Sequence, residues 1–329
     1  MKKLRIAFAL LCVLLLAGCA GRTQEAEDPQ QLIRVGFSQV GSESDWRIAN
    51  TKSMTEALSE GNGFELLIDN AKQKQENQFL AIRNFIQQEV DYIVIAPISE
   101  YGWDSVLEEA RDAHIPVIIM DRQIQVSDDS LYKCWVGSDF YGEGRTAVDW
   151  LAQKLDDEDR SDEELRILHI QGTDGATSQL MRTKALQDAV ASHENWQIVD
   201  VLKGDYTEAK TYELMQAFLK TRRDIDVIYC ENDNMTFGVI RALDEAGITH
   251  GPDGDVIVIS FDAVRDALQC CLDGKIDLCV ECNPLHGTRV ADIIQRIERG
   301  STVPKKIFVE ETSFTRGSLT PEIIEARLY

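Results

Sequence analysis

Short apolar runs and amphipathic stretches alternate along most of the chain. The runs are nearly continuous, as expected for parallel strands that are covered on both faces of a sheet. The stretches between them carry apolar residues three and four positions apart, and one of them ends at Gly247, a residue type typical of the position after a helix. The predicted strands are "IRVGFS", "FELLID", "DYIVIA", "PVIIMD", "KCWVGS", "RILHIQ", "WQIVDVL", "IDVIYC", "VIVISF", "IDLCVE" and "KIFVEE".

This alternation predicts an α/β fold with parallel sheets. Ten or eleven strands in a chain of 329 residues are too many for one open sheet of ordinary width, so we expect two doubly wound lobes. A faint internal repeat supports two lobes. "VDYIVIAPIS" precedes the strand "IPVIIMDR" much as "IDVIYCENDN" precedes "VIVISFDA". Both second strands end in polar residues.

The beginning of the chain has the composition of an export signal. Lys2, Lys3 and Arg5 precede the short apolar stretch "IAFALLCVLLLAG", so we interpret residues 1–18 as a signal peptide and not as a membrane span. The stretch ends in "LAGC", which resembles the lipobox of bacterial lipoproteins and implies that Cys19 carries a lipid. The alternative is a plain signal peptide that is cut elsewhere. Residues 19–32 are then a polar tether, and the expected location is the periplasm or the outer face of the cell membrane.

The net charge excludes one class of partner. The formal charge is −22, and removal of the three signal cations takes it to −25. A nucleic-acid surface needs clustered lysines and arginines to neutralise phosphates, so this acidity argues against nucleic-acid binding. We interpret the acidity as a solubility feature.

The cysteines leave several interpretations open. Of the eight, Cys12 is removed with the signal and Cys19 is assigned to lipid, so six remain. The segment "CVEC" is one CxxC pair without a second pair or a histidine at zinc spacing, so we predict no metal site. The alternatives are buried thiols, which we favour, a disulfide, and a metal or redox role for Cys134, Cys230, Cys270, Cys271, Cys279 and Cys282.

Polar residues follow several of the predicted strands, where ligands bind in open parallel sheets. Each has a structural alternative, since residues such as Ser44 and Asn232 also stand where a helix N-cap would stand, and Asp121 could form a loop salt bridge with Arg122. The candidates are Glu43, Ser44, Asp45, Trp46, Arg47, Asp121, Arg122, the loop "GTDGATS" with Arg182 beyond it, Asn232 and Asp262.

Two candidates are hard to explain as structural residues alone. Trp46 lies well off the apolar stripe of Met54, Ala57 and Leu58 on its predicted helix, so it is not an obvious core anchor. Arg182, in contrast, lies on the stripe that should face protein. A buried arginine there requires an acceptor or a polar ligand, because an unpaired buried charge is costly.

The candidate set has the chemistry of a carbohydrate site. Carboxylates and amides can bridge neighbouring hydroxyl groups, arginine offers a planar fork of donors, and an indole covers the C–H face of a sugar. A phosphorylated ligand would require several cations or a glycine-rich nest. Here acids balance the arginines, so the pattern favours a neutral polyol.

The order of these segments resembles a known family. "GFSQVGSESDWR", "KQKQENQ", "DYIVIAP", "QGTDGATSQLMR", "GDYT", "ENDNM" and "SFDA" are similar to type I solute-binding proteins of ABC sugar importers, a ribose-binding-protein-like family. The resemblance extends from residue 33 to the end of the chain and is strongest to the galactofuranose-type branch. It implies two lobes joined by a three-stranded hinge, with an N-lobe at 33–137 and 284–311 and a C-lobe at 138–283 and 312–329.

The resemblance also implies roles for individual residues. Residues 43–47, Asp121 and Arg122 would line the N-lobe side of a cleft, with Trp46 stacked on a furanose ring, and Arg182, Asn232 and Asp262 would reach in from the C-lobe. Asn283 near the hinge is a weaker candidate. The chain departs from the family at Asp45, where a small residue is usual, and in "ENDN", which replaces an "HNDD"-like loop.

The resemblance therefore implies an exported monomer, without cofactor, that closes on a monosaccharide and delivers it to an importer's permease and ATPase. The alternative is the same sugar clamp signalling to a membrane histidine kinase or chemoreceptor. An enzyme is disfavoured because the candidate acids lie beside arginines and no G-x-S-x-G or phosphate-binding loop is present. A transcription factor is disfavoured because a signal peptide stands where a helix-turn-helix would begin.

Overall fold

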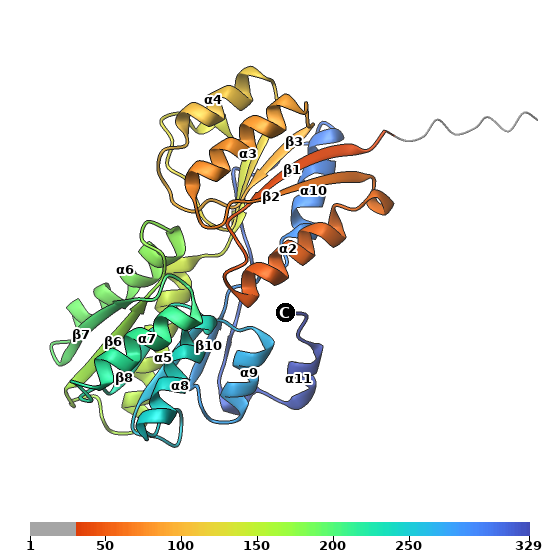
Figure 1. The fold of residues 1–329 in the computed structure, drawn as a ribbon. Coiled ribbons are helices and arrows are strands. Elements are labelled where there is room, and N and C mark those ends of the chain that lie inside the picture. Colours follow the sequence, from red (N-terminus) through yellow and green to blue (C-terminus); the bar gives the residue numbers. More distant parts are fainter. Residues whose placement is uncertain (1–30) are drawn as a thin grey trace, which may run out of the picture. The chain divides into compact units, whose positions relative to one another are not determined.

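The computed structural model describes residues 31–329, which contain two six-stranded sheets. The predicted signal peptide, Cys19 and nearly all of the tether lie outside the described residues. Each predicted strand is present, and the two sheets form two α/β lobes as expected from the strand count (Figure 1).

The first sheet has the strand order β11-β5-β4-β3-β1-β2 and is parallel throughout. Its strands are β1 (Ile33–Gln39), β2 (Phe64–Asn70), β3 (Tyr92–Ile95), β4 (Val117–Met120), β5 (Cys134–Gly137) and β11 (Lys306–Phe308). The associated helices are α2 (Asp45–Ala57), α3 (Gln75–Gln87), α4 (Asp104–Asp112) and α10 (Gly287–Glu298), with the 3₁₀ turns η1 (Glu60–Asn62) and η2 (Asp129–Leu131).

The second sheet has the order β12-β10-β9-β8-β6-β7 and is parallel except at β12. Its strands are β6 (Leu165–Gln171), β7 (Trp196–Lys203), β8 (Val227–Cys230), β9 (Ile257–Asp262), β10 (Leu278–Glu281) and β12 (Ser313–Phe314). Its helices are α5 (Phe140–Asp157), α6 (Thr177–Ser192), α7 (Glu208–Leu219), α8 (Asp233–Ala246), α9 (Arg265–Leu272) and α11 (Pro321–Ala326), with η3 (Arg316–Ser318).

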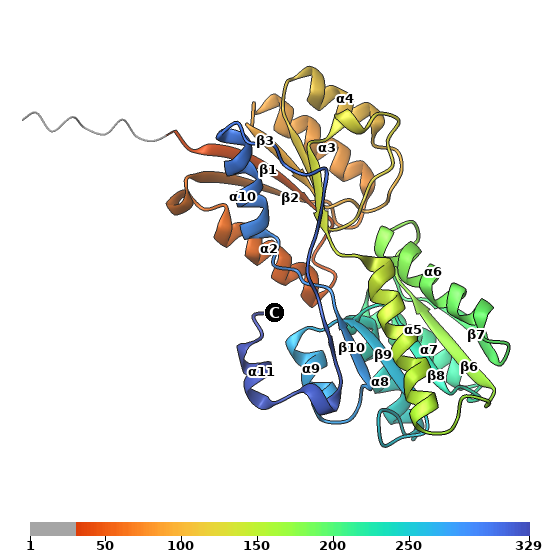
Figure 2. The ribbon, with the colours of Figure 1, turned by 180° about the vertical axis from the view of Figure 1, so that it is seen from behind.

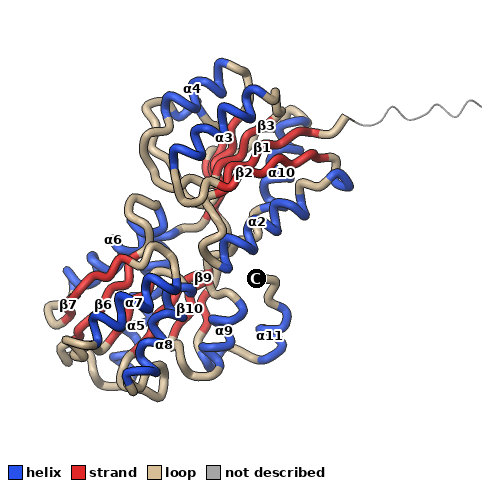
Figure 3. Tube along the Cα trace, viewed as in Figure 1, coloured by secondary structure: helices blue, strands red, loops and turns tan. Residues whose placement is uncertain are grey.

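Both faces of each sheet are covered by helices (Figure 3). In the first sheet, one apolar cluster joins the strands to α2 and α10, and another joins them to α3 and α4. In the second, α5 and α6 cover one face and α7, α8 and α9 the other. This two-sided burial explains why the strands are continuous apolar runs. Gly247 ends α8 with a φ of 68°, as predicted.

The chain passes between the sheets three times (Figure 2). The first connection, 138–139, follows β5 and leads into α5. The second, 282–286, leads from β10 back to α10, and the third, 309–312, leads from β11 to β12. We call these the three hinge connections. β12 follows the third connection and is a two-residue strand that pairs with β10 in the antiparallel direction. It was not predicted because two residues carry no periodic signal.

Candidate functional site

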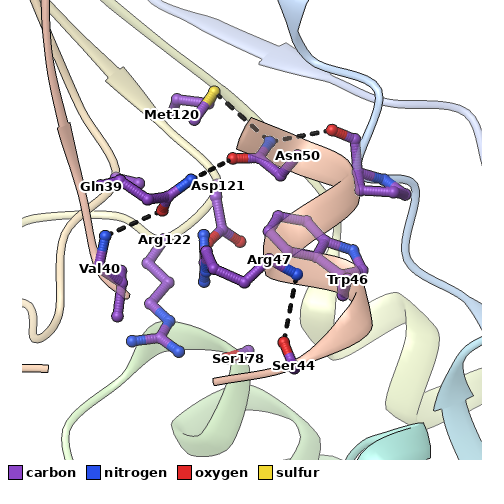
Figure 4. A network of polar contacts seen from close by, with 12 residues as sticks. Gln39, Val40, Ser44, Trp46, Arg47, Asn50, Met120, Asp121, Arg122 and Ser178 are labelled. Atoms are coloured by element: carbon purple, nitrogen blue, oxygen red, sulfur yellow. Dashed lines mark hydrogen bonds and ion pairs between the residues drawn. The ribbon is translucent and has the colours of Figure 1, made fainter. Parts of the chain in front are cut away.

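The first turn of α2 follows directly on the carboxyl end of β1. Ser44 caps this helix, because its hydroxyl oxygen accepts a hydrogen bond from the Arg47 backbone N–H at 3.2 Å. The capping alternative is therefore correct for Ser44, and the cap fixes the direction of the two residues that follow Asp45 (Figure 4).

Trp46 is held between the two lobes. Its indole is only 4% exposed and packs with the apolar cluster of the second sheet, although its helix belongs to the first. The indole Nε1 donates to the carbonyl oxygen of Cys282, in the second hinge connection, at 2.7 Å. The Arg47 guanidinium carbon lies 4.5 Å from the centre of the indole.

Arg47 is the centre of a buried ion-pair group on the first-lobe side. Its Nη2 lies 2.9 Å from Asp121 Oδ2, and its Nε lies 3.4 Å from Glu43 Oε1. Burial alone would lower the pKa of Arg47, but the charges of Asp121 and Glu43 outweigh it and raise the pKa. Asp121 comes directly after β4 and has a φ of 66°, a strained conformation of the kind found at binding sites.

Arg122 does not form the local salt bridge with Asp121 that sequence allowed as an alternative. Its Nη1 donates to the carbonyl oxygen of Ile98 at 3.0 Å, and its guanidinium lies 5.4 Å from the ring centre of Tyr206. Burial, followed by the positive charge of Arg47, lowers the pKa of Arg122. Asp121 is thus left to pair with Arg47.

Arg182, on α6, is fully buried and has the acceptors that its position requires. Its Nε and Nη2 each lie 2.7 Å from Glu143 Oε2, and its Nη1 donates to the carbonyl oxygen of Glu231 at 2.5 Å. Its Nη2 is 3.7 Å from Asp262 Oδ1. Burial opposes the charge on Arg182, but Glu143 and its neighbours raise its pKa well above the ordinary value. Glu143 does not line the cleft itself, and its ion pair with Arg182 fixes the position of that guanidinium.

Asn232 and Asp262 complete the second-lobe side. Asn232 caps α8 by accepting from Met235 N at 2.9 Å, so it has both the structural role and a place at the site. Asp262 ends β9 with a φ of 105° and is the counterpart of Asp121 in the other sheet. Burial raises its pKa well above the ordinary value, and Arg182 opposes that rise.

These side chains surround one cleft. Nine of the predicted residues line it, and they come from both lobes. The lining residues are Glu43, Ser44, Trp46, Arg47, Asp121, Arg122, Phe140, Ser178, Arg182, Tyr206, Asn232, Asp262 and Cys282.

Four lining residues were not predicted individually: Phe140, Ser178, Tyr206 and Cys282. Ser178 and Tyr206 are hydrogen-bonded to each other at 2.8 Å, and both stand in quoted motifs, "GTDGATS" and "GDYT", which offered a signal. Phe140 begins α5 just after the first hinge connection, a position that no sequence motif marks.

Two predicted residues lie outside the cleft lining. Asp45 is exposed, and its backbone N–H and carboxylate bind the side-chain amide of Asn234 at 3.0 and 2.9 Å. Asn283 lies in the second hinge connection, where its side-chain oxygen accepts from Leu285 N and its amide donates to Glu281. The structure thus places one at the rim between the lobes and the other in the hinge.

The lobes contact each other on both sides of this cleft. On one side are the two hydrogen bonds between Asp45 and Asn234. On the other, Gln123 N donates to Thr177 Oγ1 at 2.8 Å, and Glu100 N donates to the carbonyl oxygen of Gly175 at 3.1 Å. Residues 31–329 therefore adopt a closed arrangement, in which the two lobes are in contact beside the cleft.

Several charged atoms at the cleft are buried without a hydrogen-bond partner among the described residues. They belong to Glu43 (Oε2), Arg47 (Nη1), Asp121 (Oδ2) and Arg182 (Nη2), the last two having ion-pair contacts only. Buried polar groups in native proteins are nearly always satisfied, so these atoms require further partners, either water or a polar ligand. Donors and acceptors are both present, as a ligand with several hydroxyl groups requires.

Within residues 31–329 all six cysteines are free, and only Cys270 is partly exposed. The structure agrees with the buried-thiol interpretation for the other five. Burial raises the pKa of Cys230 to about 12, which keeps this thiol protonated and inert. In the same part of the chain, no helix has the length and apolar character needed to cross a membrane.

Comparison with known proteins assigns the fold to a family. Residues 35–300 match the periplasmic binding protein domain. The chain belongs to the periplasmic binding protein family. Its two parallel-sheet lobes have the type I fold, and the family consists of solute-binding proteins, so this periplasmic binding protein is not an enzyme.

Three similar proteins illustrate the relationship. Over 298 residues the chain is 36% identical to the galactofuranose-binding protein YtfQ of Escherichia coli K12, covering 90% of this chain and 91% of that protein. A Mycobacterium smegmatis protein in complex with β-D-fucofuranose has a TM-score of 0.82 and 37% identity, with 87% and 92% coverage. The binding protein of a Shewanella sp. ANA-3 arabinose transporter, bound to L-arabinofuranose, has a TM-score of 0.80 and 38% identity, with 86% and 92% coverage.

Proposed function

We propose that this periplasmic binding protein captures a monosaccharide in its furanose form and delivers it to the membrane permease of an ABC importer. The observation that carries the proposal is the set of unpartnered buried donors and acceptors around a cleft with an indole in its wall. A neutral sugar satisfies such a set without adding a charge, and its C–H face covers the indole.

The charge arrangement supports a neutral ligand over an anionic one. Arg47 is already paired with Asp121 and Glu43, and Arg182 with Glu143. Arg122 has no acid partner among the described residues, but the three acids that line the cleft balance its three arginines. The paired acids hold the arginine forks in place, and each fork still has an N–H group available for a hydroxyl.

The furanose ring is supported by the similar proteins. One is named for galactofuranose, and the two solved structures hold β-D-fucofuranose and L-arabinofuranose. All three are more than a third identical to this chain over at least 86% of it. We therefore propose a galactofuranose-like ligand.

The importer can distinguish the sugar-bound protein from the free protein because the two lobes close on the sugar. A sugar that contacts Trp46 and Arg47 on one side and Arg182 and Asp262 on the other binds the closed arrangement more tightly than an open one. It therefore shifts the population toward closure. We propose that the permease recognises this closed form of a monomer.

We also propose that Cys19 carries a lipid that attaches the protein to the membrane. Cys19→Ser is expected to release the protein into the soluble fraction while leaving sugar binding unchanged, because residues 31–329 contain the whole cleft. The measurement is fractionation of cells with detection of the protein in each fraction, and Cys12→Ser is the matched control. Membrane retention of the Cys19 variant would contradict the lipid anchor.

The central test is thermal unfolding of the lipid-free protein with a panel of sugars. L-arabinose, D-galactose, D-fucose, D-ribose and D-glucose are each added at equilibrium, so that furanose fractions are present. Sugars that bind the folded state raise the midpoint by mass action, and we expect those with furanose forms of the galactose configuration to raise it most. A panel without any shift, confirmed by calorimetry, would contradict the proposal.

Asp45→Ala is expected to weaken sugar binding although Asp45 does not line the cleft. The substitution removes the 2.9 Å hydrogen bond to Asn234 that joins the lobes in the closed arrangement. Loss of one hydrogen bond of about 1 kcal/mol corresponds to about fivefold weaker affinity, seen as faster dissociation in stopped-flow measurements. Glu56→Ala, at an exposed position on the same helix, is the control. An unchanged dissociation rate for Asp45→Ala would show that the rim contact does not stabilise closure.

A further inference from the structure

One carboxyl group holds the three hinge connections together. Glu311, in the third connection, accepts hydrogen bonds at its Oε1 from Ser138 Oγ and from the backbone N–H of Asn283, both at 2.6 Å. Ser138 belongs to the first connection and Asn283 to the second. Movement of the lobes about the hinge therefore acts directly on the Glu311 side chain.

Glu311 also lies next to the support of the sugar cleft. One carboxylate oxygen each of Glu143 and Glu311 and the Sγ atom of Cys282 all lie within 4.8 Å of one another. Glu143 Oε2 is occupied by Arg182, whereas Glu143 Oε1 is buried without a hydrogen-bond partner. The unpartnered oxygen therefore requires a donor, and Glu311 and Cys282 are the neighbouring groups that can supply one if they are protonated.

The electrostatics favour a proton on Glu311. Burial, followed by the negative charge of Glu143, raises the pKa of Glu311 to about 9. Burial raises the pKa of Glu143 above its ordinary value, and the charge and hydrogen bonds of Arg182 oppose that rise. Burial also raises the pKa of Cys282 well above its ordinary value, so the thiol stays neutral. One proton shared by the two adjacent carboxyl groups avoids the repulsion between two negative charges and gives the unpartnered oxygen of Glu143 a donor.

We propose that Glu311 is protonated at neutral pH and donates a hydrogen bond to Glu143, so that the hinge, Glu143 and Arg182 form one connected unit that positions Arg182 for the sugar. Glu143 and Glu311 are positioning residues in this proposal, which rests on the proposed function. The other charged groups near the pair are Asp139 and Glu281, which line the same groove beside the hinge, Arg327, which pairs with Glu281 at 2.9 Å, and Asp262 beyond Arg182.

The Glu143–Glu311 pair determines whether sugar affinity rises or falls with pH. Below pH 9 Glu311 is neutral and the unit is intact; above it a second negative charge faces Glu143 and the donated hydrogen bond is lost. If the protonated form alone closes on sugar, about one tenth of the protein is competent at pH 10, and the apparent Kd rises about tenfold from its neutral value.

The test is the pH profile of L-arabinose affinity, measured by calorimetry from pH 7 to pH 10 on wild-type protein and Glu311→Gln. The glutamine amide can donate to Glu143 and accept from Ser138 without titrating. We expect about a tenfold loss in the wild type and less than a twofold loss in Glu311→Gln. Glu310→Gln, the exposed neighbour, is the control and should follow the wild type. Equal profiles in wild type and Glu311→Gln would overturn the proposal.

A second measurement needs no variant. At pH 9, sugar binding by the wild type should take up about half a proton, read from the difference in binding enthalpy between two buffers with different ionisation enthalpies. No proton uptake would also overturn the proposal. So would a change of affinity after EDTA treatment, because a cation would then join Glu143, Cys282 and Glu311. Absence of any binding at pH 7 would instead contradict the proposed function itself.

Discussion

Trp46→Ala is expected to raise the Kd for sugar by about a hundredfold or more, the largest effect of any single change at the cleft. The substitution removes an aromatic surface that a sugar ring would cover, and loss of a large buried aromatic contact costs about 3 kcal/mol. It also removes the indole hydrogen bond to Cys282, which joins α2 to the second hinge connection in the closed arrangement. Isothermal calorimetry with L-arabinose measures the effect.

Two variants separate stacking from general loss of packing. Trp46→Phe keeps a flat ring but lacks the indole N–H, so an intermediate Kd is expected. Trp150→Ala removes a partly exposed tryptophan of α5 that lies at a different surface pocket, and it should bind as the wild type does. Wild-type affinity in Trp46→Ala would show that the indole is only a packing residue between the lobes.

Arg182→Lys is expected to raise the Kd by about thirtyfold to a hundredfold while preserving the fold. Lysine keeps a positive charge beside Glu143, but it lacks the fork that reaches Glu143, the Glu231 carbonyl and the cleft at the same time. Loss of charge-assisted hydrogen bonds of about 2–3 kcal/mol accounts for this range. Arg182→Ala should lose stability as well, because it leaves the Glu143 carboxylate buried without its cation.

The matched control for Arg182 is Arg166→Lys. Arg166 also pairs in a bidentate manner with an acid, Asp226, but it is partly exposed and does not line the cleft. Its replacement should change neither the Kd nor the unfolding midpoint by more than a small amount. Thermal unfolding without sugar shows whether Arg182→Lys is folded, and sugar titration then measures binding. A folded Arg182→Lys with unchanged affinity would remove Arg182 from the site.

The fold could be predicted from the sequence because its strands are buried on both faces. Each run such as "DYIVIA" is continuous in apolar residues, and helix ends such as Gly247 are marked by residue type. The same logic located Asp121 and Asp262, which follow or end their strands and adopt positive φ at the same edge of each sheet. β12 was missed because it is two residues long and is defined by its partner β10.

The arrangement of the site was less accessible from the sequence. Asp121 pairs with Arg47 from another element and not with its neighbour Arg122, because the direction of each side chain is set by tertiary packing. Asp45 turns toward Asn234 across the lobes, a contact between residues 189 positions apart. The support of Arg182 by Glu143 could not be read from the chain either, since α5 and α6 meet only after folding.

The late position of α10 and β11 in the chain has a consequence for biogenesis. Val290, Ile293 and Ile294 of α10 cover the same apolar cluster as Met54 of α2 and Leu58 at its C-cap, yet they emerge from a ribosome or translocase more than 200 residues later. Until then the first sheet lacks both an edge strand and part of one covering layer. Most of the second lobe, from α5 to β10, is synthesised in the meantime. The amino-terminal segment must therefore remain incomplete without aggregating while its neighbour folds, and chaperone protection during export is needed most at this stage.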